Sequence, residues 1–230
     1  MASGQDEVAD AIAALERFSG SAGLTTRISQ LEAGLQGLDG SSVADLIVRD
    51  GVEYQTLTGA LVVKALAGQI DVVVHTLGIL LALPAILEDG EVVEYVSLGA
   101  GNTGRRFDLE TDRRIAEFKF SAWQGGPETI RQNALFIDLY HLAEADTQKR
   151  RQLFVTELDR PIRFLQGGRS MKTVLTKHGT VAEEFSSLYG DRYKVVRDYW
   201  HDVRERVELV DVSALVPAFA RIPPEAEPLT

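Results

Sequence analysis

Alternation of apolar and charged residues over Phe107–Phe120 constrains the fold more than any other feature of the chain. Apolar side chains occupy every second position on both sides of a Thr-Asp-Arg-Arg tetrapeptide, and a period of two is typical of β-strands. If the tetrapeptide forms the loop, Glu110 pairs with Ile115 and Asp108 pairs with Glu117. Directly opposed residues of an antiparallel pair point to the same face of the sheet. The sequence therefore predicts a β-hairpin that brings two carboxylates together.

Lys119 lies two residues beyond Glu117 and is expected on the same face. Opposed carboxylates repel each other, and a divalent cation (Mg²⁺ or Mn²⁺) held by Asp108 and Glu117 would relieve the repulsion. Such a cation can lower the pKa of a bound water and stabilise charge on a phosphate, while Lys119 orients or deprotonates the attacking water. These residue types match the hydrolysis of a phosphodiester bond. The alternative is an ordinary hairpin in which Lys119 neutralises one carboxylate.

The spacing of apolar residues changes along the chain from helical to alternating and back. The predicted helices are 8–18, 24–38, 54–67, 70–87, 127–145, 181–188 and 192–203, and the predicted strands outside the hairpin are 92–96, 152–158 and 207–210. A turn is expected over 39–42. We therefore expect an α/β domain over 51–212, a helical extension over 1–50 and a loose, proline-rich tail over 213–230.

Composition excludes several classes of protein. The chain has no cysteine, which excludes a disulfide framework, a zinc-thiolate site and a cysteine nucleophile, and fits a cytoplasmic location. The polar, acidic N-terminus is unlike a signal peptide. The most apolar stretch, Ile70–Leu87, contains Asp71, His75 and Pro84 and is short for a bilayer span, so we expect a buried helix and no membrane partner.

The block from Glu91 to Leu158 resembles the core of the PD-(D/E)xK, restriction-endonuclease-like superfamily. In that family a helix, a three-strand meander, a helix and a fourth strand carry an Asp on the second strand and (D/E)xK on the third. Asp108 and Glu117-Phe118-Lys119 would be those motifs, although Phe107 stands where the family pattern has proline. The resemblance covers about a third of the chain. It implies a metal-dependent nuclease that cuts DNA, or else RNA.

Two accessory positions follow from the resemblance. Some members carry an early helical glutamate that completes the metal shell, and Glu53 is the nearest candidate. Others carry Gln-x-x-x-Tyr on the helix after the third strand; here Gln132 matches, Phe136 replaces the tyrosine and Tyr140 follows a turn later. Gln132 then either faces the site or is an exposed helix residue.

A basic stretch over 147–178 contrasts with the net charge of −10, which has the wrong sign for a nucleic-acid enzyme. A local basic surface on an acidic body can bind phosphates, although it can also be a solvated face without a partner. The candidate contacts to nucleic acid are Lys149, Arg150, Arg151, Arg163, Arg169 and Lys172. Trp123, close after Lys119, could stack on a base or belong to the core.

Two other functions remain open from the sequence. Gly99-Ala100-Gly101-Asn102-Thr103-Gly104 has the letters of a dinucleotide-binding motif, which must open a helix, whereas the residues that follow alternate as strands do. A non-catalytic binding or assembly module is the other class. The apolar stripes of the helices over 8–38 need a cover, which predicts a homo-oligomer or a partner subunit.

Overall fold

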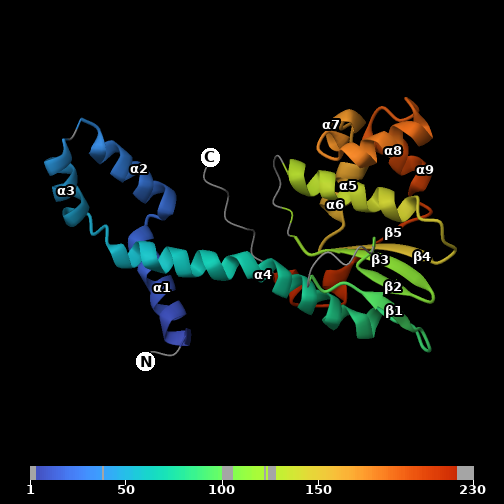
Figure 1. Cartoon of the computed structure of the whole chain (residues 1–230), viewed down its shortest axis with the longest axis horizontal. Helices are drawn as coiled ribbons and strands as arrows, with labels where there is room; N and C mark the ends of the chain where they lie inside the picture. The colour runs from blue at the N-terminus through green and yellow to red at the C-terminus, as the bar shows by residue number, and fades with distance from the viewer. Residues whose placement is uncertain (1–3, 38, 100–105, 122, 124–127, 222–230) are drawn as a thin grey trace. The chain divides into compact units, whose positions relative to one another are not determined.

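The computed structural model describes residues 4–37, 39–99, 106–121, 123 and 128–221. Its internal contacts divide the chain into two compact units, of which the first ends at Asp71 and the second begins at Val72. This division falls within a helix, later in the chain than the boundary at residue 50 that the sequence suggested. Figure 1 labels the elements of both units.

The first unit is helical, as the sequence predicted. Its helices are α1 (Gly4–Ser19), α2 (Leu24–Leu35), α3 (Gly40–Arg49) and the first part of α4 (Tyr54–Ile86). Helix α3 was not predicted, because Asp39-Gly40-Ser41-Ser42 has the composition of a turn. In the structure Asp39 caps this helix, since its side chain accepts a hydrogen bond from the backbone N–H of Ser42 at 2.9 Å.

Helix α4 differs from its prediction in two ways. It is one helix, because Gly68 continues the helical backbone at a cost of only about 1 kcal/mol. It is also buried on one face only, so the expectation of a buried helix over Ile70–Leu87 was wrong: Val73, Leu77 and Leu81 are each at least half exposed. Among the described residues, only α4 is long and apolar enough to span a bilayer, judged by length and composition alone.

The second unit contains a five-stranded mixed sheet, which confirms the predicted mixed α/β class. The strands are β1 (Val93–Val96), β2 (Leu109–Thr111), β3 (Arg114–Lys119), β4 (Arg150–Val155) and β5 (Glu208–Asp211), in the spatial order β1-β2-β3-β4-β5. The first three form an antiparallel meander, whereas β3, β4 and β5 are parallel. The predicted pairing of Glu110 with Ile115 is confirmed.

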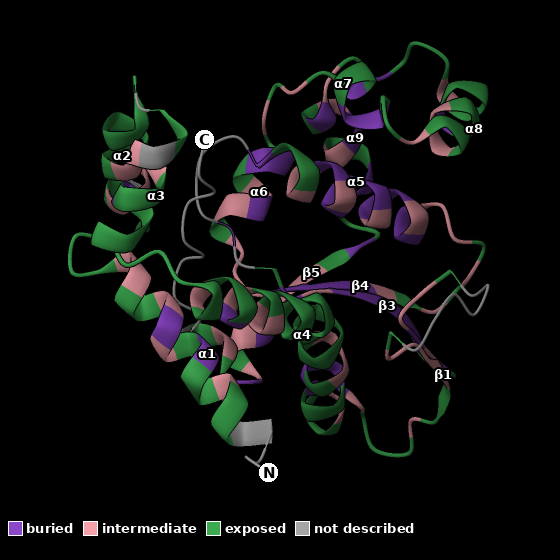
Figure 2. Cartoon of the chain, turned by 60° about the vertical axis from the view of Figure 1, so that its left-hand side comes forward, coloured by how far each residue is buried: buried purple, intermediate pink, exposed green. Residues whose placement is uncertain are grey.

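Each face of the sheet has its own apolar core. Helix α5 (Thr129–Ala143) connects β3 to β4 and covers one face, on which Ile115 and Val155 pack. The C-terminal part of α4 covers the opposite face, where Phe118 stacks on Phe154 at 4.7 Å between ring centroids. Figure 2 shows β3 and β4 buried between these layers and most of α4 exposed. This alternation turns the polar positions of β3 toward α5.

Smaller helices complete the second unit. They are α6 (Asp159–Leu165), α7 (Met171–Leu175), α8 (Gly179–Tyr189), α9 (Val196–Val203), η1 (Val212–Ala214) and η2 (Phe219–Arg221). Helix η2 and all of η1 but its first residue lie in the range 213–230 expected as a loose tail, yet Val216 is buried and the ring of Phe219 stacks on Phe120 at 4.6 Å. The packed structure therefore extends at least to Phe219.

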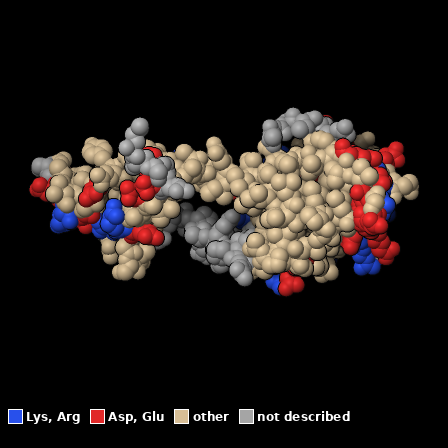
Figure 3. Space-filling view, turned by 90° about the horizontal axis from the view of Figure 1, so that it is seen from below, with Lys and Arg blue, Asp and Glu red and all other residues tan. Residues whose placement is uncertain are grey.

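The face of the second unit seen in Figure 3 carries few charged side chains over a broad area. Helix α4 lies on this side of the sheet (Figure 1), and its exposed residues Val73, Leu77, Leu80 and Leu81 recur at helical spacing. Side chains other than Lys, Arg, Asp and Glu thus predominate on this face, and exposed apolar residues of α4 are among them.

Candidate active site

The predicted hairpin brings Asp108 and Glu117 together. Asp108 directly precedes β2, and its Oδ2 accepts a hydrogen bond from the backbone N–H of Phe118 at 3.1 Å. Glu117 lies on β3 and is only 7% exposed. Its protonated carboxyl donates a hydrogen bond to Asp108. The two carboxyl groups thus form a direct pair at the place that the strand alternation predicted.

His75 on α4 completes the surroundings of Asp108. Its Nε2 lies 3.5 Å from Asp108 Oδ1, and both side chains are at most a quarter exposed. Burial favours the neutral form of Asp108, but hydrogen bonds from His75, Glu117 and the Phe118 backbone outweigh it and lower the pKa of Asp108. Asp108 is therefore the ionised member of the pair. No spacing of histidines typical of a metal site, and no other pattern in the sequence, linked His75 to Asp108.

Glu117 is the neutral member of the pair. Burial, followed by the negative charges of Asp138 and Asp108, raises the pKa of Glu117 to about 10. At neutral pH this carboxyl retains its proton unless a positive charge comes close. Two carboxyl groups that share one proton in this way titrate as a pair.

Lys119 forms an ion pair that the sequence did not reveal. Its Nζ lies 2.8 Å from Oδ2 of Asp138 on α5, and the side chain of Asp138 is 16% exposed. Burial opposes the charge of Lys119, yet Asp138, Glu117 and Asp108 together raise its pKa. The lysine is thus held as a cation. The only sequence signal for Asp138 was a charged residue between Ile137 and Leu139 in a largely buried helix.

The chemistry of this group fits a divalent cation. The three carboxyl groups of Asp108, Glu117 and Asp138 could carry three negative charges, whereas Lys119 supplies one positive charge. The proton retained by Glu117 reduces this excess of negative charge. Within the described ranges, no cluster of three or more Asp, Glu, His or Cys side chains is arranged to hold a metal. Mg²⁺ usually takes one or two carboxylates and keeps several waters, so Asp108 and Glu117 are the residues that could hold it.

The accessory residues lie in different places. Gln132 on α5 accepts a hydrogen bond through Oε1 from Arg169. Glu53 is exposed, directly precedes α4 and belongs to the first unit. Of the glycine motif only Gly99 is among the described residues; β2 and β3 follow it over 106–121, where a dinucleotide site would need a helix.

The basic stretch does not lie in one place. Lys149 and Arg150, at the start of β4, form ion pairs with Glu94 at 2.6 Å and Glu88 at 2.7 Å. Arg151 donates hydrogen bonds to the backbone oxygens of residues 145 and 147. Arg163 and Arg169 lie beyond the other end of β4, which is roughly 20 Å long. Lys172 is exposed on α7.

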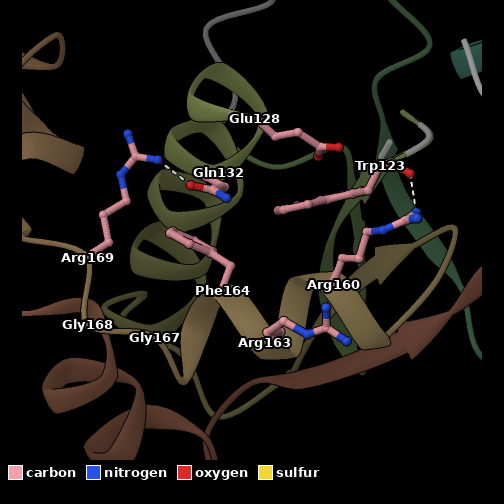
Figure 4. A pocket seen from close by; sticks show the side chains of 9 residues that line it. All are labelled: Trp123, Glu128, Gln132, Arg160, Arg163, Phe164, Gly167, Gly168 and Arg169. Carbon is pink, nitrogen blue, oxygen red and sulfur yellow. Dashed lines mark hydrogen bonds between the residues drawn. The ribbon is translucent and has the colours of Figure 1, made fainter. Parts of the chain in front are cut away.

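Beyond the C-terminal ends of β3 and β4 lies a pocket of about 370 Å³ (Figure 4). It is lined by Trp123, Glu128, Gln132, Arg160, Arg163, Phe164, Gly167, Gly168 and Arg169. Trp123 is 7% exposed and its ring lies 6.3 Å from that of Phe164, so most of its surface belongs to the core. The polar side chains of this pocket are those of the three arginines, Glu128 and Gln132.

Comparisons of the chain with protein-family models, curated proteins and solved structures found no match. A candidate function therefore rests on the residues of the site and their geometry.

Proposed function

We propose that the chain is a metal-dependent nuclease of the restriction-endonuclease-like kind that hydrolyses phosphodiester bonds of DNA. The observation that carries the proposal is that the hairpin brings the partly buried Asp108 and Lys119 together with the buried Glu117, in a group where one carboxyl is ionised and the other retains a proton. A group with this excess of carboxylates costs stability in a purely structural role. It becomes useful when a cation replaces the proton of Glu117.

Each residue has a distinct role in the proposed reaction. Asp108 and Glu117 would hold Mg²⁺ or Mn²⁺, which would lower the pKa of a bound water and offset charge on the scissile phosphate. Lys119 stays cationic and would stabilise the negative charge that develops on the phosphate. It therefore does not act as the base that deprotonates the water. His75 and the Phe118 backbone N–H fix the orientation of Asp108. Asp138 is a positioning residue that holds Lys119.

Cleavage assays test this proposal. The full chain is incubated with single- and double-stranded DNA and with RNA in Mn²⁺, Mg²⁺ or EDTA. We expect cleavage of DNA only with metal, and a loss of at least a hundredfold in Glu117→Gln and in Lys119→Met. Glu183→Gln, which changes an exposed glutamate on α8, is the matched control. Cleavage that persists in both site variants would contradict the assignment.

We also propose, as a second candidate function, that two copies of the chain associate through α4. Lys64 and Asp71 are exposed and seven residues apart, so they share a face of the helix with Leu57 and Leu61, which are 58% exposed. Neither charge has an ion-pair partner within the described residues. In an antiparallel pair of α4 helices with a two-fold axis near Gly68, each Lys64 meets Asp71 of the other copy.

This charge pattern favours a second copy over a lipid bilayer, in which both charges would be costly. Light scattering on size-separated protein tests the idea, with a dimer expected for the natural sequence. Lys64→Glu should weaken the dimer by like-charge repulsion, and adding Asp71→Lys should restore it. A monomer at every protein concentration, or a dimer indifferent to Lys64→Glu, would contradict it.

A further inference from the structure

The pocket beyond the C-terminal ends of β3 and β4 has a positive lining that the catalytic group does not use. Three arginines and one glutamate line it, and of the arginines Arg160 forms an ion pair with Glu157 at 3.1 Å. Arg163 is exposed and has no ion-pair partner in the part of the chain that the structure describes. Arg169 donates to the neutral amide oxygen of Gln132 and has no ion pair with any residue that the structure describes. An anion would meet two guanidinium groups that form no ion pair within the described residues, in a pocket that Glu128 also lines.

Hydrogen bonds and a tight turn hold the wall of the pocket in place. Arg160 donates hydrogen bonds to the backbone oxygen of Trp123 and to Glu157, which ties the start of α6 to the segment after β3. The end of α6 turns tightly at Gly167, where a Cβ atom would lie 2.9 Å from the Phe164 oxygen. Figure 4 shows Arg160 and Arg163 on one side of the pocket and Gln132 with Arg169 on the other. The guanidinium groups therefore come from elements that pack against one another.

The pocket also lies at the same end of the parallel strands as Lys119. Lys119 is the last residue of β3 and is in register with Val155, the last residue of β4. Helix α6 begins at Asp159, shortly after that strand, and α5 contributes both Gln132 to the pocket and Asp138 to the lysine. Ligands of α/β proteins commonly bind outside the carboxyl ends of parallel strands.

We propose that this pocket binds a phosphate group of the nucleic-acid strand on which the catalytic group acts, with Arg163 and Arg169 as the main contacts. The proposal rests on the proposed nuclease function. Guanidinium groups bind phosphate through paired N–H donors, and their charge is retained at any ordinary pH. The phosphate is either the terminal phosphate of a strand or an internal phosphodiester. A strand held there is positioned relative to the cleavage site.

Binding without cleavage tests this site. Twelve-residue single-stranded DNA with a fluorescent label on its 3′ end, and either a 5′-phosphate or a 5′-hydroxyl, is titrated with the full chain in EDTA. The variants are Arg163→Gln and Arg163→Gln/Arg169→Gln, and both arginines lie outside the buried core. Lys177→Gln removes an equal charge from an exposed position outside the pocket and is the matched control. Circular dichroism confirms that each variant is folded.

Arg163→Gln should weaken binding about tenfold or more relative to Lys177→Gln, the loss expected for one charge-assisted hydrogen bond. A loss confined to the 5′-phosphorylated strand identifies the terminal phosphate, and an equal loss for both strands identifies an internal one. Equal affinities of Arg163→Gln and Lys177→Gln for both strands would overturn the proposal. Failure of the nuclease function would instead appear as absent cleavage with Mn²⁺ while this arginine-dependent binding persists.

Discussion

At the scale of single residues, the site is governed by competition for positive charge. Burial and two neighbouring carboxylates keep the proton on Glu117, whereas hydrogen bonds keep Asp108 ionised. Lys119 forms an ion pair with Asp138, so its single charge does not neutralise both Asp108 and Glu117. In the ordinary hairpin that is the alternative to a nuclease site, Lys119 would neutralise one carboxylate; in the structure its nearest carboxylate partner is Asp138 on α5.

Replacement of Glu117 by glutamine should flatten the dependence of stability on pH. The pKa of Glu117 in the folded chain, about 10, lies above its ordinary value of 4.5, so folding takes up a proton between these values. The stability contributed by this group is complete below pH 4.5 and is lost as pH rises toward 10, by up to about 1.4 kcal/mol per pH unit. Urea unfolding at pH 6, 7.5 and 9 should show this slope in the natural chain and in Glu183→Gln, but a reduced slope in Glu117→Gln.

Asp138→Asn should shift the pH dependence of cleavage. Burial lowers the pKa of Lys119 and Asp138 is the largest influence that raises it, so removal of this carboxylate lets the lysine lose its proton at lower pH. We expect the alkaline limb of the rate profile to move to lower pH and the maximal rate to fall about tenfold or more. A uniformly reduced rate with an unchanged profile would show that Asp138 acts only through folding.

At the scale of elements, a buried ion pair lies at the end of β3 opposite to the end that carries Lys119. Arg114 on β3 donates hydrogen bonds to both carboxylate oxygens of Glu91 and, at 2.8 Å, to Gln152 on β4. Gln152 donates in turn to Glu208 on β5 at 2.8 Å. The side chains of Glu91 and Arg114 are at most 3% exposed. This chain of contacts links side chains of β3, β4 and β5.

Glu91→Gln should destabilise the second unit by about 3–5 kcal/mol, because it leaves the charge of Arg114 buried without its partner. The hydrogen bond from Arg114 lowers the pKa of Glu91 to about 2, against its ordinary value of 4.5. Stability from this pair is therefore present above pH 4.5 and lost as pH falls toward 2. Glu94→Gln, whose carboxylate is half exposed beside Lys149, should cost about 1 kcal/mol or less in the same denaturant titration.

Two glycines of α4 should respond oppositely to alanine. A Cβ atom at Gly78 would lie 2.6 Å from the Phe120 ring and 2.8 Å from the Phe219 ring, whereas nothing lies within 4 Å at Gly68. Gly78→Ala should lower the free energy of unfolding by about 1–2 kcal/mol, since overpacking exceeds the gain in helix propensity. Gly68→Ala should raise it by about 0.5–1 kcal/mol. Equal effects would mean that α4 does not pack on the sheet as described.

At the scale of the whole molecule, the sequence predicted what local periodicity encodes. Alternation predicted the hairpin and the shared face of Asp108, Glu117 and Lys119. Helix α3 was not predicted, because its first residues have the composition of a turn. Asp138 and His75 were not predicted, because their roles depend on how α5 and α4 pack on the sheet, and spacing within one helix carries no such information. The basic stretch was predicted as one surface, but β4 separates its two ends.

The measurement that tests the central claim most directly is a calorimetric titration of Mn²⁺ into the full chain at pH 6, 7 and 8, each in two buffers of different ionisation enthalpy. We expect binding that strengthens with pH and releases about one proton per ion, because Glu117 must lose its proton to become a ligand. Glu117→Gln should lose this binding and Glu183→Gln should keep it. Binding that is unchanged in Glu117→Gln, or no binding to the natural chain at pH 8, would contradict a metal site at this hairpin.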